Sequence, residues 1–193
     1  MLFRSATTGT VITLPVEELT RKAFAEFGDV LSPDELERLP INLYGGTMDC
    51  YRAGPFEADG PVEFLVTRYQ KRELRVHFLE RHLLLTQTFI VFGGPMVFVV
   101  APPDAPLQND FPELSTARAF LLPTNGAVNI HRRTWHEPPF PLVDGTVTVA
   151  TNHQAVTAGL TSVPNEFGEI DAGDVDKRSV THRTGYELRV ALA

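Results

Sequence analysis

The sequence predicts a mainly β protein, a sandwich or barrel of many short strands that follows short N-terminal helices. From Asn42 onward, most of the chain falls into short runs rich in Val, Phe, Ile, Leu or Thr. These runs cover residues 61–70, 74–82, 86–93, 96–103, 117–123, 127–132, 146–152 and 186–193. Turn-forming residues separate them, as at Asn125-Gly126 and Asp144-Gly145. Many short strands at such close spacing are typical of a sandwich or barrel.

The N-terminal part of the chain predicts a strand and two short helices. Residues 11–19 have the pattern of a strand that feeds a turn. Residues 20–28 predict a helix that begins at the capping residue Thr20 and ends at Gly28. Residues 32–40 carry a second helical signal, and they could equally form an inserted surface segment.

Length, composition and charge limit the class of protein to which this chain can belong. A chain of 193 residues with 43% hydrophobic and 21% charged residues predicts one soluble globular domain over residues 1–193. The net charge of −7, without a dense Lys/Arg tract, argues against nucleic acid as a partner. The most apolar stretch, residues 89–101, is too short to span a membrane. The polar, acidic stretch 162–178 predicts a surface loop.

The N-terminal residues lack the long apolar run of a signal peptide, and the single cysteine, Cys50, allows no internal disulfide. A reducing, cytoplasmic location fits both observations best. Nothing near Cys50 in the sequence marks it as an activated thiol, so we expect it to be inert.

One group of polar residues has the composition of a metal-binding or proton-transfer site. Glu80 and His82 are two residues apart in a predicted strand, so their side chains share one face. Gln87 follows in the next run, and His131 comes soon after the turn at Gly126. A return strand that carries His131 would complete a set of one acid, one amide and two imidazoles. Such a set holds a metal ion or moves protons on a small polar substrate.

The spacing of these residues resembles the motifs of the cupin barrels. The first cupin motif has a histidine, one spacer, a histidine, a few residues, a glutamate, six residues and a glycine. Here Glu80-x-His82-x4-Gln87-x6-Gly94 has the same spacing, with Glu80 in place of the first histidine and Gln87 in place of the glutamate. The second cupin motif places a histidine shortly after a Pro…Gly turn, as His131 lies here.

Three segments resemble the ureidoglycolate lyase family, also called ureidoglycolate hydrolase, more specifically. They read FLERHLLLTQTFI at 78–90, VNIHRRTWHEPPF at 128–140 and LTRKAFAEFGDVL at 19–31. The resemblance runs from about Leu14 to about Asn152. It implies a cupin-like β-barrel (a double-stranded β-helix or jelly roll) that forms homodimers. It also implies a carbon–nitrogen lyase of the amidine-lyase class, which splits ureidoglycolate into glyoxylate and urea in purine and allantoin breakdown, and in some members a divalent metal.

The sequence departs from the family pattern in places where a small substrate could be contacted. Within Asp49–Ala53, Cys50 replaces an arginine that is usual in the family. Leu83 replaces the proline after Glu-Arg-His, and Thr151–Gln154 replaces an end of the barrel that contains Asp-Arg. These changes leave two alternatives open: a cupin-fold lyase or isomerase acting on a different small hydroxy or keto acid, and a non-catalytic protein that binds a metabolite.

Cleavage of ureidoglycolate needs a base for the hydroxyl proton, an acid for the leaving urea nitrogen and an anchor for the carboxylate. We expect Glu80, His82 and His131 to be catalytic. A divalent metal such as Ni, Zn or Mn, held by Glu80, His82, Gln87 and His131, would bind the carboxylate and hydroxyl together. Without a metal, His82 or His131 would be the base directly. Arg68, on the preceding strand, is the candidate clamp for the small carboxylate substrate.

The remaining candidates for substrate binding are Gln87, Trp135, His136 and His153. A tryptophan in this position is more often a core or dimer anchor than a catalytic group. The prolines at 138 and 139 suggest a rim loop for His136 and leave its role undecided. His153 is expected as a contact at the rim. His77 has the opposite strand parity to Glu80 and His82, so we expect it to face outward or an interface.

Overall fold

The computed structural model describes residues 10–41 and 44–192, and it is mainly β, as predicted. The strands up to the site are β1 (Val11–Glu18), β2 (Gly28–Val30), β3 (Glu37–Arg38), β4 (Tyr51–Arg52), β5 (Val62–Arg68), β6 (Arg75–Val76), β7 (Phe78–Arg81), β8 (Gln87–Phe92) and β9 (Met96–Ala101). The later strands are β10 (Leu107–Gln108), β11 (Phe111–Pro112), β12 (Arg118–Leu122), β13 (Ala127–Ile130), β14 (Trp135–His136), β15 (Phe140–Pro141), β16 (Val147–His153), β17 (Ile170–Ala172), β18 (Val175–Ser179) and β19 (Glu187–Ala191). The α-helices are α1 (Arg21–Phe24), α2 (Gln154–Leu160) and α3 (Val180–Thr184), and 3-10 turns lie at Pro33–Glu35, Tyr44–Gly46 and Leu114–Thr116.

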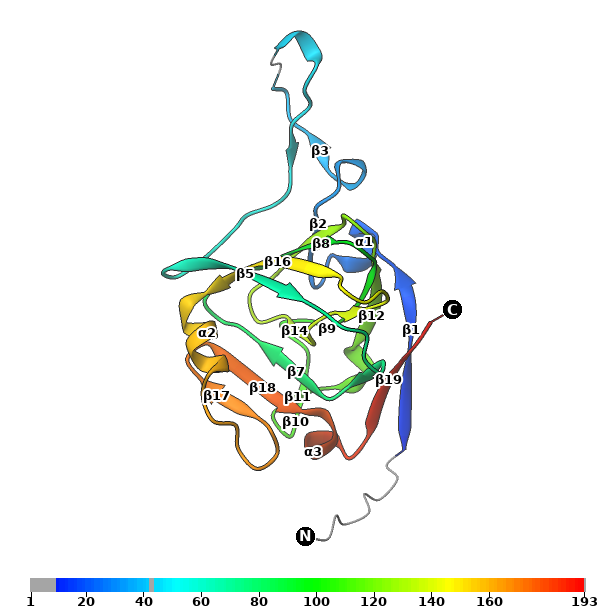
Figure 1. Cartoon of the computed structure of the whole chain (residues 1–193), viewed down its shortest axis with the longest axis vertical. Helices are drawn as coiled ribbons and strands as arrows, with labels where there is room; N and C mark the ends of the chain where they lie inside the picture. Colours follow the sequence, from blue (N-terminus) through cyan, green and yellow to red (C-terminus); the bar gives the residue numbers. More distant parts are fainter. Residues whose placement is uncertain (1–9, 42–43, 193) are drawn as a thin grey trace.

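Two curled sheets form the body of the molecule (Figure 1). The larger has ten strands among the described residues, in the order β17-β18-β7-β14-β9-β12-β1-β19-β6, with β15 also paired to β9. The smaller has five strands in the order β2-β13-β8-β16-β5. Most neighbours are antiparallel, and β1 runs parallel to both β12 and β19. This curled arrangement of antiparallel strands confirms the predicted cupin-like β fold.

Strand β9 explains how two cores form on either side of one sheet. Its six residues are all buried. Phe98 and its even-numbered neighbours pack with Phe89 and Val128 of the smaller sheet, between the two sheets. Val99 and its odd-numbered neighbours pack on the other face, in a second core that includes Leu188. Because side chains alternate along a strand, a strand covered on both faces becomes a continuous apolar run.

The N-terminal region contains less helix than predicted: α1 ends at Phe24, Gly28 begins β2, and residues 32–40 take the alternative of a surface segment. Helix α1 begins as predicted, with the Thr20 hydroxyl accepting a 3.2 Å bond from the backbone N–H of Ala23. Residues 32–40, however, form a 3-10 turn and then strand β3, which pairs with β4 in a hairpin that projects from the body (Figure 1). The projecting segment has no core on which a helix could bury an apolar face, and packing of such a face is what stabilises short helices.

The prediction of a surface loop over residues 162–178 is wrong in its second half. Strands β17 and β18 form a hairpin there, and β18 pairs with β7. The charges of this segment are paired, with Arg178 contacting Asp171 at 2.8 Å and Arg81 contacting Asp176 at 2.7 Å. A polar sequence can therefore lie in a sheet when its charges pair with each other.

Within residues 10–41 and 44–192, no helix has the length and apolar character needed to cross a membrane.

Candidate active site

Three side chains on neighbouring strands form a compact cluster of potential ligands. Glu80 of β7 lies directly opposite His136 of β14, and His82 is the first residue after β7. The carboxylate Oε1 of Glu80 lies 3.8 Å from Nε2 of His136 and 4.0 Å from Nε2 of His82. All three side chains are buried. One donor atom from each lies within 4.8 Å of the others, which is close enough for a single metal ion to bind all three.

Backbone hydrogen bonds orient both imidazoles toward Glu80. Nδ1 of His82 lies 2.8 Å from the carbonyl oxygen of Asp174, and Nδ1 of His136 lies 3.0 Å from that of Thr134. A carbonyl oxygen only accepts, so each Nδ1 carries the proton and each neutral ring has its lone pair on Nε2. The two lone pairs therefore face the carboxylate. Metal-binding histidines are held in this way, by a hydrogen bond from the nitrogen that does not bind the ion.

Burial shifts the pKa values of two members of the cluster, Glu80 and His136. Burial raises the pKa of Glu80 above its ordinary value, although His82 and Lys177 oppose the shift. Burial and the neighbouring His82 lower the pKa of His136 to about 3. His136 thus stays an uncharged imidazole at neutral pH. Two histidines and one carboxylate are a donor set that fits a divalent transition metal such as zinc or nickel.

The cluster lies at one wall of a cavity of about 180 Å³ between the two sheets. The opposite wall comes from the smaller sheet and contributes Thr67 and Tyr69 at the end of β5, Gln87 of β8, and Asn152 of β16. Phe89 and Leu65 add apolar surface, and helix α2 closes one side with Val156 and Leu160. Burial raises the pKa of Tyr69, so its hydroxyl stays neutral. The cavity therefore has one wall with groups that can gain or lose a proton, Glu80, His82 and His136. The opposite wall, called here the neutral wall, carries uncharged groups that can form hydrogen bonds.

The structure brings together Glu80, His82 and Gln87, as the sequence predicts, but it does not bring His131 to them. His131 lies outside both the cluster and the residues that line the cavity. Ile130 lies opposite Gln87 in the sheet and occupies the inner face, so the next residue turns away. The half-buried His131 begins a turn that is closed by a bond from the N–H of Thr134.

His136, and not His131, is the second imidazole beside Glu80 and His82. The prediction of a rim loop for His136 is wrong, because β14 is a short strand inside the large sheet. Trp135 precedes it and faces the other way, fully buried in the core beneath β9. Trp135 is thus a core residue, with the guanidinium of Arg81 4.3 Å from its ring centre, and not a substrate contact. The alternation of Trp135 and His136 is the sequence signal that could have identified His136.

Arg68 does not serve as a clamp in this cavity. It is exposed and lies on β5 between Thr67 and Tyr69, both of which line the cavity. Strand alternation therefore points Arg68 outward.

His153 also lies away from the cavity. Its Nδ1 accepts a 3.0 Å bond from the N–H of Ala155 at the start of α2, and its Nε2 lies 3.2 Å from the carbonyl oxygen of Asp59. Both ring nitrogens thus have structural partners, and His153 is not placed to contact a ligand in the cavity. His77 is exposed, as strand parity predicted.

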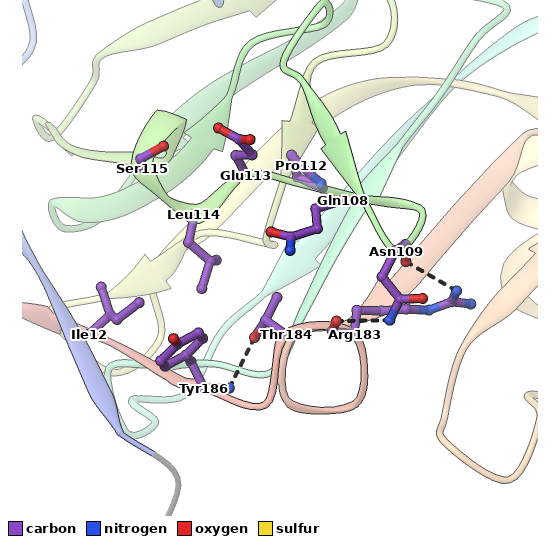
Figure 2. Close-up of a pocket in the computed structure, with 10 residues that line it drawn as sticks. All are labelled: Ile12, Gln108, Asn109, Pro112, Glu113, Leu114, Ser115, Arg183, Thr184 and Tyr186. Atoms are coloured by element: carbon purple, nitrogen blue, oxygen red, sulfur yellow. Dashed lines mark hydrogen bonds between the residues drawn. The ribbon is translucent and has the colours of Figure 1, made fainter.

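A second cavity, of about 450 Å³, lies between β10, β11 and the end of α3 (Figure 2). Its polar groups are largely committed to each other: the amide of Asn109 donates to the carbonyl of Arg183, and the N–H of Tyr186 donates to the Thr184 hydroxyl. The guanidinium of Arg183 is paired with Glu169 at 2.7 Å. This cavity is larger but lacks a cluster of ligands, so the smaller cavity is the candidate active site.

Comparisons with known proteins identify the family. The model of the family described as ureidoglycolate lyase matches residues 11–162. A ureidoglycolate lyase of Pseudomonas fluorescens (strain Pf0-1) is 36% identical over 132 residues, which are 65% of this chain and 75% of that protein. A ureidoglycolate lyase of Pseudomonas syringae pv. syringae (strain B728a) is 36% identical over 131 residues, 65% of this chain and 74% of that protein.

Among solved structures, a dTDP sugar isomerase from Desulfovibrio desulfuricans G20 aligns with 60% of this chain and 72% of its own, at 18% identity and a TM-score of 0.32. A superposition this loose supports no conclusion about the site. The family match, in contrast, spans most of the chain and includes Glu80, His82 and His136. The chain therefore belongs to the ureidoglycolate lyase family.

Proposed function

We propose that this protein is a ureidoglycolate lyase, a carbon–nitrogen lyase of the amidine-lyase class that releases glyoxylate and urea. The observation that carries the proposal is the buried cluster of Glu80, His82 and His136 in a small cavity. Two segments of the family match supply this cluster, one on β7 and one on β14. The relatives named above support the choice of substrate, because each is named a ureidoglycolate lyase.

The reaction needs only two proton transfers and the cleavage of one carbon–nitrogen bond. The substrate hydroxyl loses its proton as its carbon becomes the aldehyde of glyoxylate. The carbon–nitrogen bond breaks, and the departing urea nitrogen gains a proton. No water is consumed and no electrons are transferred to a second reactant, so one base and one acid within reach are sufficient.

The cluster can supply both groups without a metal. Nε2 of His82 carries a free lone pair and acts as the base. Glu80, whose pKa burial raises, carries the proton for the urea nitrogen. His136, with a pKa of about 3, is a poor proton acceptor and helps to position the substrate.

The same three side chains also fit a divalent metal, and we propose Ni, Zn or Mn as candidates. Bound by Glu80, His82 and His136, such an ion would act as a Lewis acid on the substrate oxygens. The two roles of the cluster predict opposite results on chelation. Loss of turnover with EDTA, and its recovery on adding one metal, would assign these residues as ligands. Turnover that survives chelation, in protein free of metal by elemental analysis, would assign them as acid and base.

The neutral wall provides the contacts for a small carboxylate. Among the residues that line the cavity there is no arginine or lysine. The hydroxyls of Tyr69 and Thr67 are donors on this wall, because burial keeps Tyr69 protonated and the Thr148 hydroxyl already donates to the Tyr69 oxygen. A carboxylate in this cavity would therefore rely on neutral donors or on the metal ion.

The test is the release of glyoxylate and urea from ureidoglycolate by the purified protein, with and without divalent metals. Glu80→Gln is the informative variant, and Glu169→Gln is a matched control. Both variants remove one buried carboxylate, but Glu169 directly precedes strand β17 and lies outside the cavity. Equal release of both products by the wild type and the control, with loss in Glu80→Gln, supports the proposal. The absence of turnover under every metal condition would contradict it.

One observation favours a second candidate, a lyase or isomerase acting on a different small hydroxy or keto acid. Of the two main departures from the family pattern, one falls on the cavity wall, at Asn152. The other, Asp49–Ala53, contains strand β4 of the projecting hairpin and contributes no residue to the cavity. A panel of small hydroxy and keto acids, assayed beside ureidoglycolate, separates the two candidates. Tight binding without turnover of any compound would instead favour a protein that only binds a metabolite.

We also propose that the chain forms a homodimer through the outer face of the smaller sheet. Phe64 and Val66 on the edge strand β5 are 74% and 71% exposed, and Phe92 on β8 adds to the same apolar face. Exposed apolar patches of this kind mark contact surfaces. Analytical ultracentrifugation tests this: Val66→Lys should yield a monomer, whereas Val163→Lys, at a position 93% exposed outside this face, should not. A monomeric wild type would contradict the proposal.

A cytoplasmic location is the final part of the proposal, and the single Cys50 supports it because the chain can form no internal disulfide. Recovery of the protein in the cytoplasmic fraction of cells would support this location, and recovery outside the cytoplasm would contradict it.

A further inference from the structure

Gln87 presents an unpaired hydrogen-bond acceptor inside the active-site cavity. Its side chain is 6% exposed and lines the cavity. Among the described residues, its amide oxygen Oε1 is buried and has no hydrogen-bond partner. Its amide nitrogen Nε2 donates to Oδ1 of Asn152 at 3.3 Å. A buried polar atom without a partner in the protein is a place where a bound ligand can supply one.

A chain of hydrogen bonds runs from this amide to the edge of the sheet. Nδ2 of Asn152 donates to the hydroxyl of Thr157 on helix α2 at 3.0 Å. The Thr157 hydroxyl in turn donates to Oε1 of Glu63 on β5. The relay Glu63–Thr157–Asn152–Gln87 therefore connects a partly exposed carboxylate with a buried amide at the cavity wall.

The direction of every bond in the relay follows from Glu63. An ionised carboxylate offers only acceptors, so the Thr157 hydroxyl must donate its proton to it. The Thr157 oxygen then accepts from Asn152, which must present its nitrogen there and its oxygen to Gln87. Gln87 therefore donates through its own nitrogen, and its oxygen is the atom left without a partner at the cavity wall. Without Glu63, the two amides could rotate together and present the nitrogen of Gln87 instead.

We propose that Glu63 is a positioning residue that makes Gln87 an acceptor, and that this acceptor selects ligands carrying an N–H donor. The inference rests on the proposed function, for which the donor is the terminal NH₂ of the ureido group. A ligand with a methyl group in that place would leave Oε1 of Gln87 buried and unpaired. A ligand with an NH₂ group would pair with it.

The experiment uses two ligands that differ at this one group. N-carbamoylglycine keeps the ureido group and the carboxylate of the proposed substrate but lacks its hydroxyl, so it is not cleaved. N-acetylglycine has a methyl group where N-carbamoylglycine has its terminal NH₂. Isothermal titration calorimetry gives the dissociation constant of each, in the buffer that supports turnover. We expect the wild type to prefer N-carbamoylglycine by about tenfold, the usual effect of leaving one buried acceptor unpaired.

Two variants interrupt the relay without touching the cavity wall. Glu63→Gln replaces the carboxylate with an amide that can also donate a hydrogen bond, and Thr157→Val removes the hydroxyl. In both variants, the ratio of the affinities for N-carbamoylglycine and N-acetylglycine should fall toward one. Thr157→Ser keeps the hydroxyl and should keep the preference. Glu26→Gln removes the same charge as Glu63→Gln at an exposed position outside the relay, and it should also keep the preference.

The ratio of the two affinities separates positioning from a merely structural role. If Glu63→Gln and Thr157→Val weaken both ligands equally and the tenfold ratio survives, the relay does not set the orientation of Gln87 and the inference is overturned. A wild type that shows no preference also overturns it, even if ureidoglycolate is cleaved. The proposed function fails by a different result, the absence of glyoxylate and urea release by the wild type.

Discussion

Glu80 and Glu169 are both buried glutamates, but the protein shifts their pKa values in opposite directions. Glu169 accepts two 2.7 Å bonds from the guanidinium of Arg183 and one from the N–H of Ser179. These bonds, with that of Arg183 first, lower the pKa of Glu169 to about 2. Glu80 has no such partner; it faces the imidazoles of His82 and His136, and burial raises its pKa.

The difference lies in which effect is larger: the bond from Arg183 outweighs burial at Glu169, whereas burial outweighs the opposing effects of His82 and Lys177 at Glu80. A carboxylate held by an arginine fork is fixed in its charged form and serves the fold. A buried carboxyl beside two Nε2 lone pairs in a cavity can change its proton or bind a metal. The comparison therefore separates a structural acid from a reactive one. The predictions below test that separation, from the largest expected effect to the smallest.

Replacing Glu80 should affect activity far more than stability. Glu80→Gln keeps the shape of the side chain but removes its proton transfer and most of its affinity for a metal. We expect kcat/KM for ureidoglycolate to fall by about 10²–10⁴-fold. The unfolding free energy in urea should not fall, because no ion pair is lost. A variant with wild-type kcat/KM would place the reactive acid elsewhere.

Replacing Glu169 should have the opposite effect. Glu169→Gln removes the nearer carboxylate of Arg183, which is 19% exposed, and leaves only that of Asp110 at 3.9 Å. Removal of one partner from a buried pair should lower the unfolding free energy by about 3 kcal/mol. Urea denaturation measures this, and the kcat of the folded variant should stay at the wild-type value. Unchanged stability would show that the Glu169–Arg183 pair contributes nothing net.

The same carboxylate predicts how stability depends on pH. The pKa of Glu169 is about 2 in the folded protein, below the ordinary value of 4.5 that applies to the unfolded chain. A lowered pKa means that the unfolded chain binds the proton first as the pH falls. The stabilisation by Glu169 is therefore complete above pH 4.5 and is lost as the pH falls toward 2. Thermal unfolding from pH 6 to pH 2.5 should show a shallower decline for Glu169→Gln than for the wild type, and parallel curves would contradict this.

The smallest effect is expected at the histidine that lies outside the cluster. His131→Asn should change kcat/KM by about twofold or less, because His131 does not line the cavity. His136→Asn removes one of the two imidazoles and should lower kcat/KM by about 10²-fold or more. Steady-state assays of the two variants side by side check the assignment. A reversed order would restore His131 to the site.

The sequence alone predicted the part of the site that lies within one strand. Glu80 and His82 are two residues apart, and a strand places such residues on one face regardless of its surroundings. The family resemblance and the short strands likewise predicted the β fold. The prediction for Arg68 is wrong, although the sequence contains the information that excludes Arg68: its strand parity is opposite to that of Thr67 and Tyr69.

Tertiary structure alone decided which second imidazole reaches Glu80. His131 and His136 are five residues apart, with a turn between them, and the sequence does not show where β14 meets β7. That register depends on bonds between segments more than fifty residues apart in the chain. Alternation within a strand is local geometry that the sequence carries. The pairing of distant strands is set by the packing of the whole core, which places His136 opposite Glu80 and turns His131 away.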